Sequence, residues 1–389
     1  MDDRLSEARA KRVVVIHSSD EMYGADRVTL QVAEALQSMD GVELEVWLPN
    51  DVAPGPTPLS HHLAARGVTV RHLELPMLRR ALLTPRGLVE IARRAQQLRA
   101  GLCHHGADLV YLTTSACLPA APVARAAGVD AVVLHMQELW AGRERAILGA
   151  LAKATTTRIA ISSAVDRASG LRDPHPVVIP NTVAEPTVVA PPLCAEGRPG
   201  GLRYVVASRW TPRKGYGTLL DAWSLAGCPG HLTILGGAPP SGRAVDVPAL
   251  VEQVARPETV TVIGEVADIA PYIAEADVVL LPSDEPEGFG LVPIEGFAQG
   301  RPAIASRAGG VVDVITHGID GWLFTPKDAA SLAAVFESLT PALVTAAGER
   351  ARRSYNARHT PERFTTQIQA LIAEALCLEA PVLVSAPAS

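Results

Sequence analysis

Two glutamates with seven residues between them, Glu287 and Glu295, bound a glycine-rich segment of the chain. The segment reads Glu-Gly-Phe-Gly-Leu-Val-Pro-Ile-Glu and follows an apolar run at residues 278–281, which we expect to be a buried strand. Pro293 suits the first turn of a helix, and Gly300 suits its C-terminal cap. The pattern therefore predicts one carboxylate before a helix and the other one turn into it, at opposite ends of a ligand-sized gap.

The glycines of this segment predict a backbone that a ligand can approach closely. Gly288 and Gly290 permit positive φ, and the free amides of the following helix turn would attract phosphate oxygens. Carboxylates beside an anion are repelled unless they bind something else, and sugar hydroxyls are suitable donors. Taken alone, Glu295 is equally well a residue that complements the helix dipole, and Glu287 could simply face solvent.

A second candidate is the segment Ser208-Arg-Trp-Thr-Pro-Arg-Lys-Gly215, which precedes an expected helix at residues 216–225. Arg209 and Lys214 in this segment could clamp a diphosphate, with each charge-assisted hydrogen bond worth about 1.5–3 kcal/mol. Lysine occurs only four times in the chain, so its presence here is informative. The alternative is an ordinary solvated loop.

Short β-branched runs alternate with turns and amphipathic stretches along most of the chain, which is typical of parallel sheets with helices on both faces. Ligands of such sheets bind at the carboxyl ends of the strands. We expect strands at residues 13–17, 42–48, 68–72, 108–113, 131–135, 157–161 and 177–179, and then at 204–208, 232–235, 260–263, 278–281, 303–306 and 321–324.

Proline and glycine accumulate at residues 183–201, which predicts a linker between two domains. The expected fold class is α/β, with two doubly wound, Rossmann-like domains at residues 1–182 and 202–360 that face a central cleft. A C-terminal helix at 361–379 would pack back on the N-terminal domain, and residues 380–389 would form a frayed tail.

Composition narrows the class of protein. The 389 residues are 48% apolar and 20% charged, which favours a large core over disorder, and the net charge of −6 argues against nucleic acid as the main partner. The five cysteines show no metal-ligand spacing and no disulfide framework, which favours a reducing cytosol. No apolar run approaches the roughly 18 residues of a spanning helix, so we expect any membrane association to be peripheral.

These motifs together resemble the family 4 retaining glycosyltransferases of GT-B fold. The family signature is a carboxylate pair with seven residues between, then a small-residue helix and a Gly-Gly turn. The resemblance covers most of the chain and is weakest at residues 52–107. Its matching segments are Glu287 to Glu295, Ala298-Gln-Gly300-Arg-Pro302, Ala308-Gly309-Gly310, Asp320-Gly-Trp-Leu-Phe-Thr-Pro326, Arg209, Lys214 and Ile179-Pro-Asn-Thr182.

The resemblance implies a UDP- or GDP-linked sugar as donor, bound mainly by the second domain. Arg209 and Lys214 would hold the diphosphate, and Glu295 would take the ribose hydroxyls. Glu287 would take donor-sugar hydroxyls near the reacting carbon. No metal or other cofactor is implied, because cations and a helix dipole would neutralise the leaving diphosphate. The implied cradle is completed by amides of Phe289, Gly290, Leu291, Gly309 and Gly310.

The first half contributes Gly24 and His135. The segment Tyr23-Gly24-Ala25-Asp26 resembles the family's Gly-Gly-Ala-Glu loop near phosphate and acceptor, with Tyr23 in place of the first glycine. Gly24 is equally well a turn residue. His135 resembles the family's active-site histidine, whose ring or backbone lies by the donor sugar, although a histidine at a strand end is often structural.

The resemblance implies a hexosyltransferase-type enzyme that moves a sugar to an acceptor hydroxyl with retention of configuration, in glycan, glycolipid or specialised-metabolite biosynthesis. Retention without an evident enzymic nucleophile suggests front-face attack, in which the leaving diphosphate takes the acceptor's proton. Two alternatives stay open, a sugar-nucleotide epimerase of the same architecture and a non-catalytic sugar-nucleotide-binding partner protein. The sequence identifies neither the acceptor nor the oligomeric state.

A cluster of arginines between Arg79 and Arg99 contains one acid, Glu90, within an apolar helical pattern. Such a surface could dock on anionic lipid, which would place a cytoplasmic enzyme peripherally at the inner membrane face. The alternative is a core-facing helix with a solvated arginine face. The cluster consists of Arg79, Arg80, Arg86, Arg93, Arg94 and Arg99.

Overall fold

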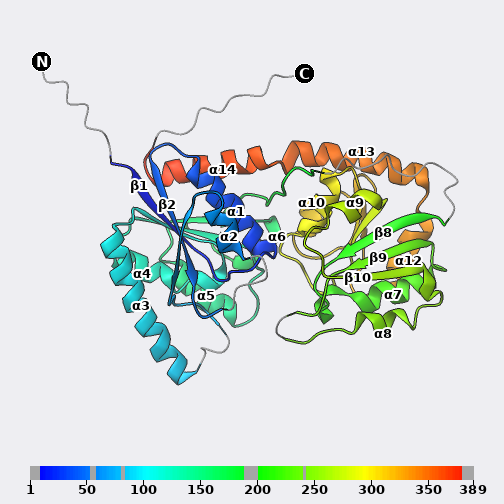
Figure 1. Cartoon of the computed structure of the whole chain (residues 1–389), viewed down its shortest axis with the longest axis horizontal. Coiled ribbons are helices and arrows are strands. Elements are labelled where there is room, and N and C mark those ends of the chain that lie inside the picture. Colours follow the sequence, from blue (N-terminus) through cyan, green and yellow to red (C-terminus); the bar gives the residue numbers. More distant parts are fainter. Residues whose placement is uncertain (1–8, 53–57, 80–83, 188–199, 240–241, 379–389) are drawn as a thin grey trace, which may run out of the picture. The chain divides into compact units, whose positions relative to one another are not determined.

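The computed structural model describes residues 9–52, 58–79, 84–187, 200–239 and 242–378. The chain forms two compact units, which we call unit 1 (Met1–Ile179 and Glu362–Ser389) and unit 2 (Pro180–Pro361). Each unit is a parallel sheet flanked by helices (Figure 1). Most of the expected linker, residues 188–199, lies outside the described residues, as do Arg80 and the expected tail at 380–389.

Unit 1 contains a seven-stranded parallel sheet in the order β3-β2-β1-β4-β5-β6-β7. The order reverses between β1 and β4, which is the switch point where open sheets of this kind bind ligands. Strands β4 and β5 are buried along their whole length, as expected for a sheet covered on both faces. The strands are β1 (Lys11–Ile16), β2 (Val42–Pro49), β3 (Thr69–Leu73), β4 (Leu109–Leu112), β5 (Ala131–Met136), β6 (Thr157–Ala160) and β7 (Val177–Val178).

The two ends of the chain share one core in unit 1. Phe364, Ile368 and Ile372 recur at helical spacing on α14 and join the core formed by α1 and the first strands. Figure 1 shows α14 running beside α1. The helices of this unit are α1 (Gly24–Gln37), α2 (Leu59–Ala64), α3 (Pro85–His105), α4 (Ala120–Ala126), α5 (Glu144–Ala152), α6 (Ser163–Ser169) and α14 (Pro361–Ala375).

Unit 2 contains a six-stranded parallel sheet in the order β10-β9-β8-β11-β12-β13. Its strand order reverses between β8 and β11, so the loops that follow these two strands flank its switch point. The strands are β8 (Leu202–Ala207), β9 (Gly230–Leu235), β10 (Val260–Gly264), β11 (Val278–Leu281), β12 (Ala303–Ser306) and β13 (Gly321–Phe324).

An aromatic cluster anchors the helices of unit 2 to its sheet. The rings of Tyr204, Trp223 and Phe336 pack edge to face with centroids 5.2–5.5 Å apart. These contacts tie α7 and α12 to β8. The helices are α7 (Tyr216–Leu225), α8 (Val247–Val251), α9 (Ala270–Glu275), α10 (Leu291–Ala298), α11 (Val311–Val314), α12 (Ala329–Ser338) and α13 (Pro341–Arg358).

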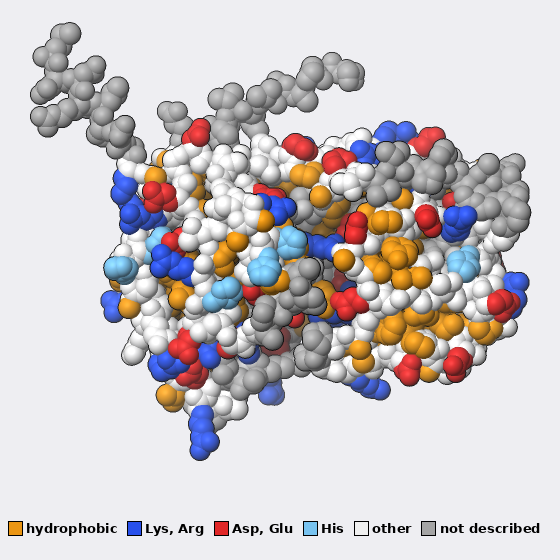
Figure 2. Space-filling view, in the orientation of Figure 1, with side chains coloured by type: hydrophobic (Ala, Val, Ile, Leu, Met, Phe, Trp, Pro, Cys, Tyr) orange, Lys and Arg blue, Asp and Glu red, His pale blue; other side chains and the backbone are white. Residues whose placement is uncertain are grey.

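All thirteen expected strands are present, and the predicted pair of Rossmann-like sheets is confirmed. Acidic and basic side chains of the described residues are interspersed on the face shown in Figure 2. Among the described helices, none is by itself both long and apolar enough to cross a membrane. The α12 helix and residues 341–375 meet that criterion only as a pair bent by 100°.

Candidate functional site

The loop after β8 approaches the loop after β11 closely at a glycine, Gly215. Gly215 has φ +70°, and a Cβ at this position would collide with the carbonyl oxygen of Pro282. The amides of Asp284 and Glu285 also donate to the carbonyl of Arg213. The close approach brings Lys214, at the end of a 3₁₀ turn (η3, Pro212–Lys214), beside the segment that carries Glu287.

Glu287 and Lys214 form an ion pair at this edge of the sheet. Lys214 Nζ lies 2.7 Å from Glu287 Oε1, and the Ser283 hydroxyl donates to the same oxygen at 2.5 Å. Arg213 Nη2 lies 3.8 Å from Oε2. Burial would raise the pKa of Glu287, but the charge and hydrogen bond of Lys214 and the hydrogen bond of Ser283 hold it below its ordinary value. The carboxylate is therefore ionised at neutral pH.

The Gly-Gly turn after β12 holds the main chain of Glu287. The amide of Gly310 donates to the Glu287 carbonyl at 2.8 Å. Gly309 has φ +71°, and a Cβ there would collide with the same carbonyl oxygen. The Glu287 carbonyl thus accepts the hydrogen bond of the Gly310 amide in this structure, and the predicted role of that amide toward the donor stays a prediction. The turn acts on the site through the position of Glu287.

The remaining predicted residues of unit 2 lie on the segment from Glu287 into α10. Gly290 has φ +98° and precedes the first residue of the helix, Leu291. Phe289 is buried, with its ring edge-on to His359. Glu295 lies half-buried one turn into the helix, as its spacing predicted.

The arrangement combines cations with an ionised carboxylate at the switch point of unit 2. Lys214 and Glu287 have side chains 22% and 14% exposed, so both are partly accessible to a ligand. Arg209 is exposed on the same loop after β8. Charges of both signs at one sheet edge suit a ligand that carries negative charge and hydroxyl donors together. The sequence motifs assigned neither Ser283 nor Arg213 to the site.

The carboxyl edge of the unit 1 sheet carries a closed network of polar groups. His17 Nδ1 lies 2.5 Å from Thr113 Oγ1, and Nε2 lies 3.0 Å from Asp26 Oδ1. Ser19 donates to Asp26 Oδ1 at 2.7 Å, and the amide of Tyr23 donates to Oδ2 at 3.1 Å. Burial raises the pKa of Asp26, but His17 and Ser19 lower it below its ordinary value. These bonds fix the loop that leads into α1.

Gly24 is exposed as the first residue of α1, beside this network. A neighbouring carboxylate, Glu138, follows β5 and was not predicted. It accepts from the Ser115 amide at 3.1 Å and hydroxyl at 2.7 Å. The sequence signal that could have identified it is its position just after a buried strand, where the carboxyl edge lies.

His135 lies in the core of unit 1 and its ring is fully buried. Its Nδ1 pairs with the Tyr111 hydroxyl at 2.9 Å, and Phe364 stacks on the ring with centroids 6.5 Å apart. Burial lowers the pKa of His135 to about 3, so the ring is neutral. The buried Nε2 has no hydrogen-bond partner among the described residues, and a catalytic role stays a prediction.

Two of the four arginines of α3, Arg93 and Arg94, are paired with acids. Arg93 lies 2.8 Å from Glu74 and 2.6 Å from Glu90, and Arg94 lies 2.6 Å from Asp51. Arg79 also pairs with Asp51, at 3.1 Å. Acids outside the helix thus neutralise much of the charge that the sequence suggested for this surface.

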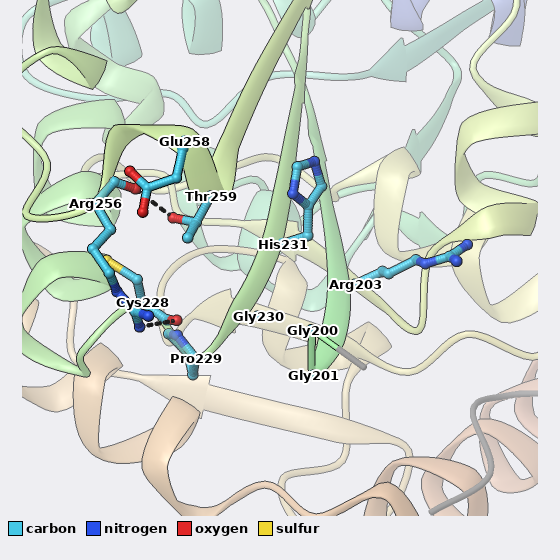
Figure 3. A pocket seen from close by; sticks show the side chains of 10 residues that line it. All are labelled: Gly200, Gly201, Arg203, Cys228, Pro229, Gly230, His231, Arg256, Glu258 and Thr259. Carbon is cyan, nitrogen blue, oxygen red and sulfur yellow. Dashed lines mark hydrogen bonds between the residues drawn. The ribbon is translucent and has the colours of Figure 1, made fainter. Parts of the chain in front are cut away.

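A pocket of about 520 Å³ lies at the amino ends of β8 and β9, away from the Lys214 loop (Figure 3). Arg203, His231 and Arg256 line it, and Figure 3 shows these side chains pointing in different directions. The polar groups therefore do not converge on one ligand. Within the described part of the chain, no three His, Cys, Asp or Glu side chains gather as metal ligands would.

Comparison with known sequences matches part of the second unit to a family model. Residues 202–340 match the family model described as Glycosyl transferases group 1. The chain is 33% identical over 129 residues to N-acetyl-alpha-D-glucosaminyl L-malate synthase of Bacillus anthracis, over 33% of this chain and 34% of that protein. It is 37% identical over 111 residues to D-inositol 3-phosphate glycosyltransferase of Pseudarthrobacter chlorophenolicus, over 28% and 26%. The matched segments thus span about a third or less of these relatives.

Comparison with solved structures covers nearly the whole chain. Anabaena HepE in complex with UDP has a TM-score of 0.76 and 21% identity, over 94% of this chain and 100% of that chain. Sucrose-phosphate synthase from Thermosynechococcus elongatus has a TM-score of 0.72 and 20% identity, over 94% and 99%. These likenesses confirm the predicted GT-B fold.

Proposed function

We propose, from the premise that residues 202–340 form a group 1 glycosyltransferase domain in a GT-B fold, that the protein transfers a sugar from a nucleoside diphosphate sugar to an acceptor hydroxyl. The observation that carries this proposal is the partly exposed Lys214–Glu287 pair at the switch point of unit 2. The ammonium suits a diphosphate, and the carboxylate suits the hydroxyls of the attached sugar.

In this proposal Lys214 and Arg209 bind the diphosphate, and Arg213 adds a third cation on the same loop. Glu287 accepts hydrogen bonds from the donor sugar, and Glu295 accepts them from the ribose. Anabaena HepE, whose fold this chain shares, was solved with UDP and with UDP-glucose. Uridine nucleotides are therefore the first donors to test.

We propose that transfer retains the anomeric configuration by front-face attack. The acceptor hydroxyl forms the new bond to the anomeric carbon, the bond to the diphosphate oxygen breaks, and the diphosphate takes the acceptor's proton. Lys214 and the arginines of its loop stabilise the negative charge that grows on the leaving group. With this charge already balanced by side chains, the reaction would proceed without a metal ion.

The pairing of Arg93 and Arg94 with acids reduces the positive charge that α3 could offer to a membrane. We propose a cytoplasmic location, which suits the unpaired thiols of Cys103, Cys117, Cys228 and Cys377. The acceptor and the oligomeric state are left to experiment.

The experiment is a thermal-shift panel of nucleoside diphosphates and their sugars, followed by turnover with candidate acceptors. A donor present at about 100 times its Kd should stabilise the protein by about 2.7 kcal/mol. Release of nucleoside diphosphate that depends on acceptor supports the proposal. Isomerised nucleotide sugar without such release would identify an epimerase instead, and binding without turnover would indicate a non-catalytic partner protein.

A further inference from the structure

Ser283 contributes a fully buried hydroxyl to the carboxylate of Glu287. Ser283 lies two residues after the end of β11 and has no exposed surface. Its Oγ donates to Glu287 Oε1 at 2.5 Å, and Lys214 Nζ donates to the same oxygen at 2.7 Å. One carboxylate oxygen thus accepts hydrogen bonds from two donors, which lie on two different loops.

The second oxygen of Glu287 has a different environment. Arg213 Nη2 lies 3.8 Å from Oε2, beyond hydrogen-bond distance. Oε1 of the carboxylate therefore accepts hydrogen bonds from the protein, whereas Oε2 is suited to accept a hydrogen bond from a ligand. Rotation of the carboxylate would exchange these two roles, so the donors to Oε1 decide which oxygen a ligand meets.

Lys214 alone is a poor anchor for this orientation, because the proposed donor competes for it. A diphosphate carries more negative charge than one carboxylate and would draw the ammonium toward itself. The hydroxyl of Ser283 is uncharged and buried, so the arriving phosphate exerts far less pull on it. The Ser283 bond is then the one that persists when donor is bound.

We propose that Ser283 is a positioning residue that holds Glu287 Oε1 while the donor diphosphate engages Lys214, so that Oε2 stays directed at the donor sugar. This inference rests on the proposed function. Because Ser283 is buried, it acts through Glu287 and does not contact the ligand. The hydroxyl also helps keep Glu287 ionised, since its bond is among those that lower the pKa of this carboxyl.

A neighbouring pair of the same chemistry provides a matched control. The Thr218 hydroxyl donates to Asp284 Oδ1 at 2.8 Å, one residue after Ser283. Thr218→Val removes a hydroxyl bond to a carboxylate in the same loop cluster while leaving Glu287 untouched. Any general loosening of the loop should appear in this variant as well.

The test compares Ser283→Ala with Thr218→Val in the full chain, by calorimetric binding and by kcat/KM across pH. For Ser283→Ala we expect affinity for UDP or GDP within about twofold of the unmodified protein. We expect affinity for the accepted nucleotide sugar to fall about tenfold, the typical loss for one hydrogen bond to a charged group. The acid limb of the kcat/KM profile should move to higher pH, and Thr218→Val should change none of these.

Equal losses for diphosphate and nucleotide sugar, or an unmoved acid limb, would overturn the inference. If Ser283→Ala fails to fold, Ser283→Cys keeps a similar volume with a weaker donor and should change the same three readouts in the same direction. An unmodified protein that binds diphosphates and their sugars equally well and turns over none would refute the proposed function itself. The two failures are therefore distinguishable.

Discussion

Unit 1 and unit 2 carry the same kind of parallel sheet but use its carboxyl edge differently. In unit 1 the pair of His17 and Asp26 has side chains 0% and 3% exposed, and each partner makes a further side-chain hydrogen bond. In unit 2 the pair of Lys214 and Glu287 is 22% and 14% exposed. The first network is closed, whereas the second leaves part of each charge accessible.

The difference teaches that an ion pair at a switch point does not by itself identify a ligand site. A buried and fully bonded pair has no remaining capacity for a ligand, and breaking it costs stability. A partly exposed pair keeps part of each charge in contact with solvent, so its charges are available for binding. We therefore expect substitutions at the edge of unit 1 to change stability and substitutions at the edge of unit 2 to change turnover.

The largest effect is expected for Lys214→Met. Removing one cation that stabilises the leaving diphosphate should lower turnover by about 10²–10³-fold. Some loss of thermal stability should accompany the loss of turnover, because a mostly buried carboxylate is left with Ser283 and Arg213 beside it. The measurement is the initial rate of nucleoside diphosphate release with the donor that the protein accepts.

Lys327→Met is the matched control, since this exposed lysine lies on the turn after β13 in the same unit. It should leave the rate unchanged. Unchanged turnover by Lys214→Met would contradict the assignment of the donor site to the carboxyl edge of the unit 2 sheet.

The next largest effect, a loss of stability, is expected for Asp26→Asn, which breaks the closed network of unit 1. The substituted amide would place its nitrogen against donors that now bond to a carboxylate oxygen, and each buried donor left unpaired costs about 1–3 kcal/mol. Amide hydrogen exchange should therefore quicken in peptides of α1 and β1 and stay unchanged in α7 and β8. Undiminished protection in unit 1 would show that the network is not a source of stability.

Much of the secondary structure of unit 2 could be predicted, because it follows from residues close together in the sequence. Strands β11, β12 and β13 have the predicted bounds, since each is a short apolar run between turn residues. The order of Glu287, helix and Glu295 also follows from nearby proline and glycine. The partners of Glu287 could not be predicted, because Lys214 lies 73 residues away and Gly310 reaches it from the loop after β12.

His135 shows the same limit in unit 1. Alternation along β5 places it on the face of Ala131 and Val133, and this much was readable from the sequence. At the carboxyl end of β5 this face is covered by Phe364. Phe364 belongs to α14, more than 200 residues later in the chain. Local pattern could not reveal that the ring is core rather than edge.

A smaller effect is expected for His135→Phe, which tests whether this residue belongs to the core. The folded-state pKa of His135 is about 3, below the unfolded value of about 6.5, so the unfolded chain binds more protons between these values. Stability should therefore fall as pH drops below about 6.5, by roughly 1–2 kcal/mol between pH 6.5 and pH 5. The variant should lose this part of the slope in thermal unfolding at the two pH values.

Tyr111→Phe is the control for this measurement. It removes the hydrogen bond to Nδ1 but keeps the imidazole, so it should lower stability at both pH values and retain the slope. Identical slopes in His135→Phe and the unmodified protein would mean that the ring is accessible to protons, as an edge residue would be.

The smallest effect is expected at α3, where unit 1 again pairs its charges internally. Arg93 is bonded to Glu74 and Glu90, so Arg93→Gln should remove little free positive charge from the surface. A free arginine near an anionic membrane contributes about 1 kcal/mol, and we expect less than that, so partition onto phosphatidylserine vesicles should change by less than about fivefold. Co-sedimentation at low and physiological salt is the measurement, because a free charge would lose its effect as salt rises. Loss of vesicle binding by more than tenfold would show that the arginines of α3 face a partner, and that unit 1, like unit 2, keeps charge available for binding.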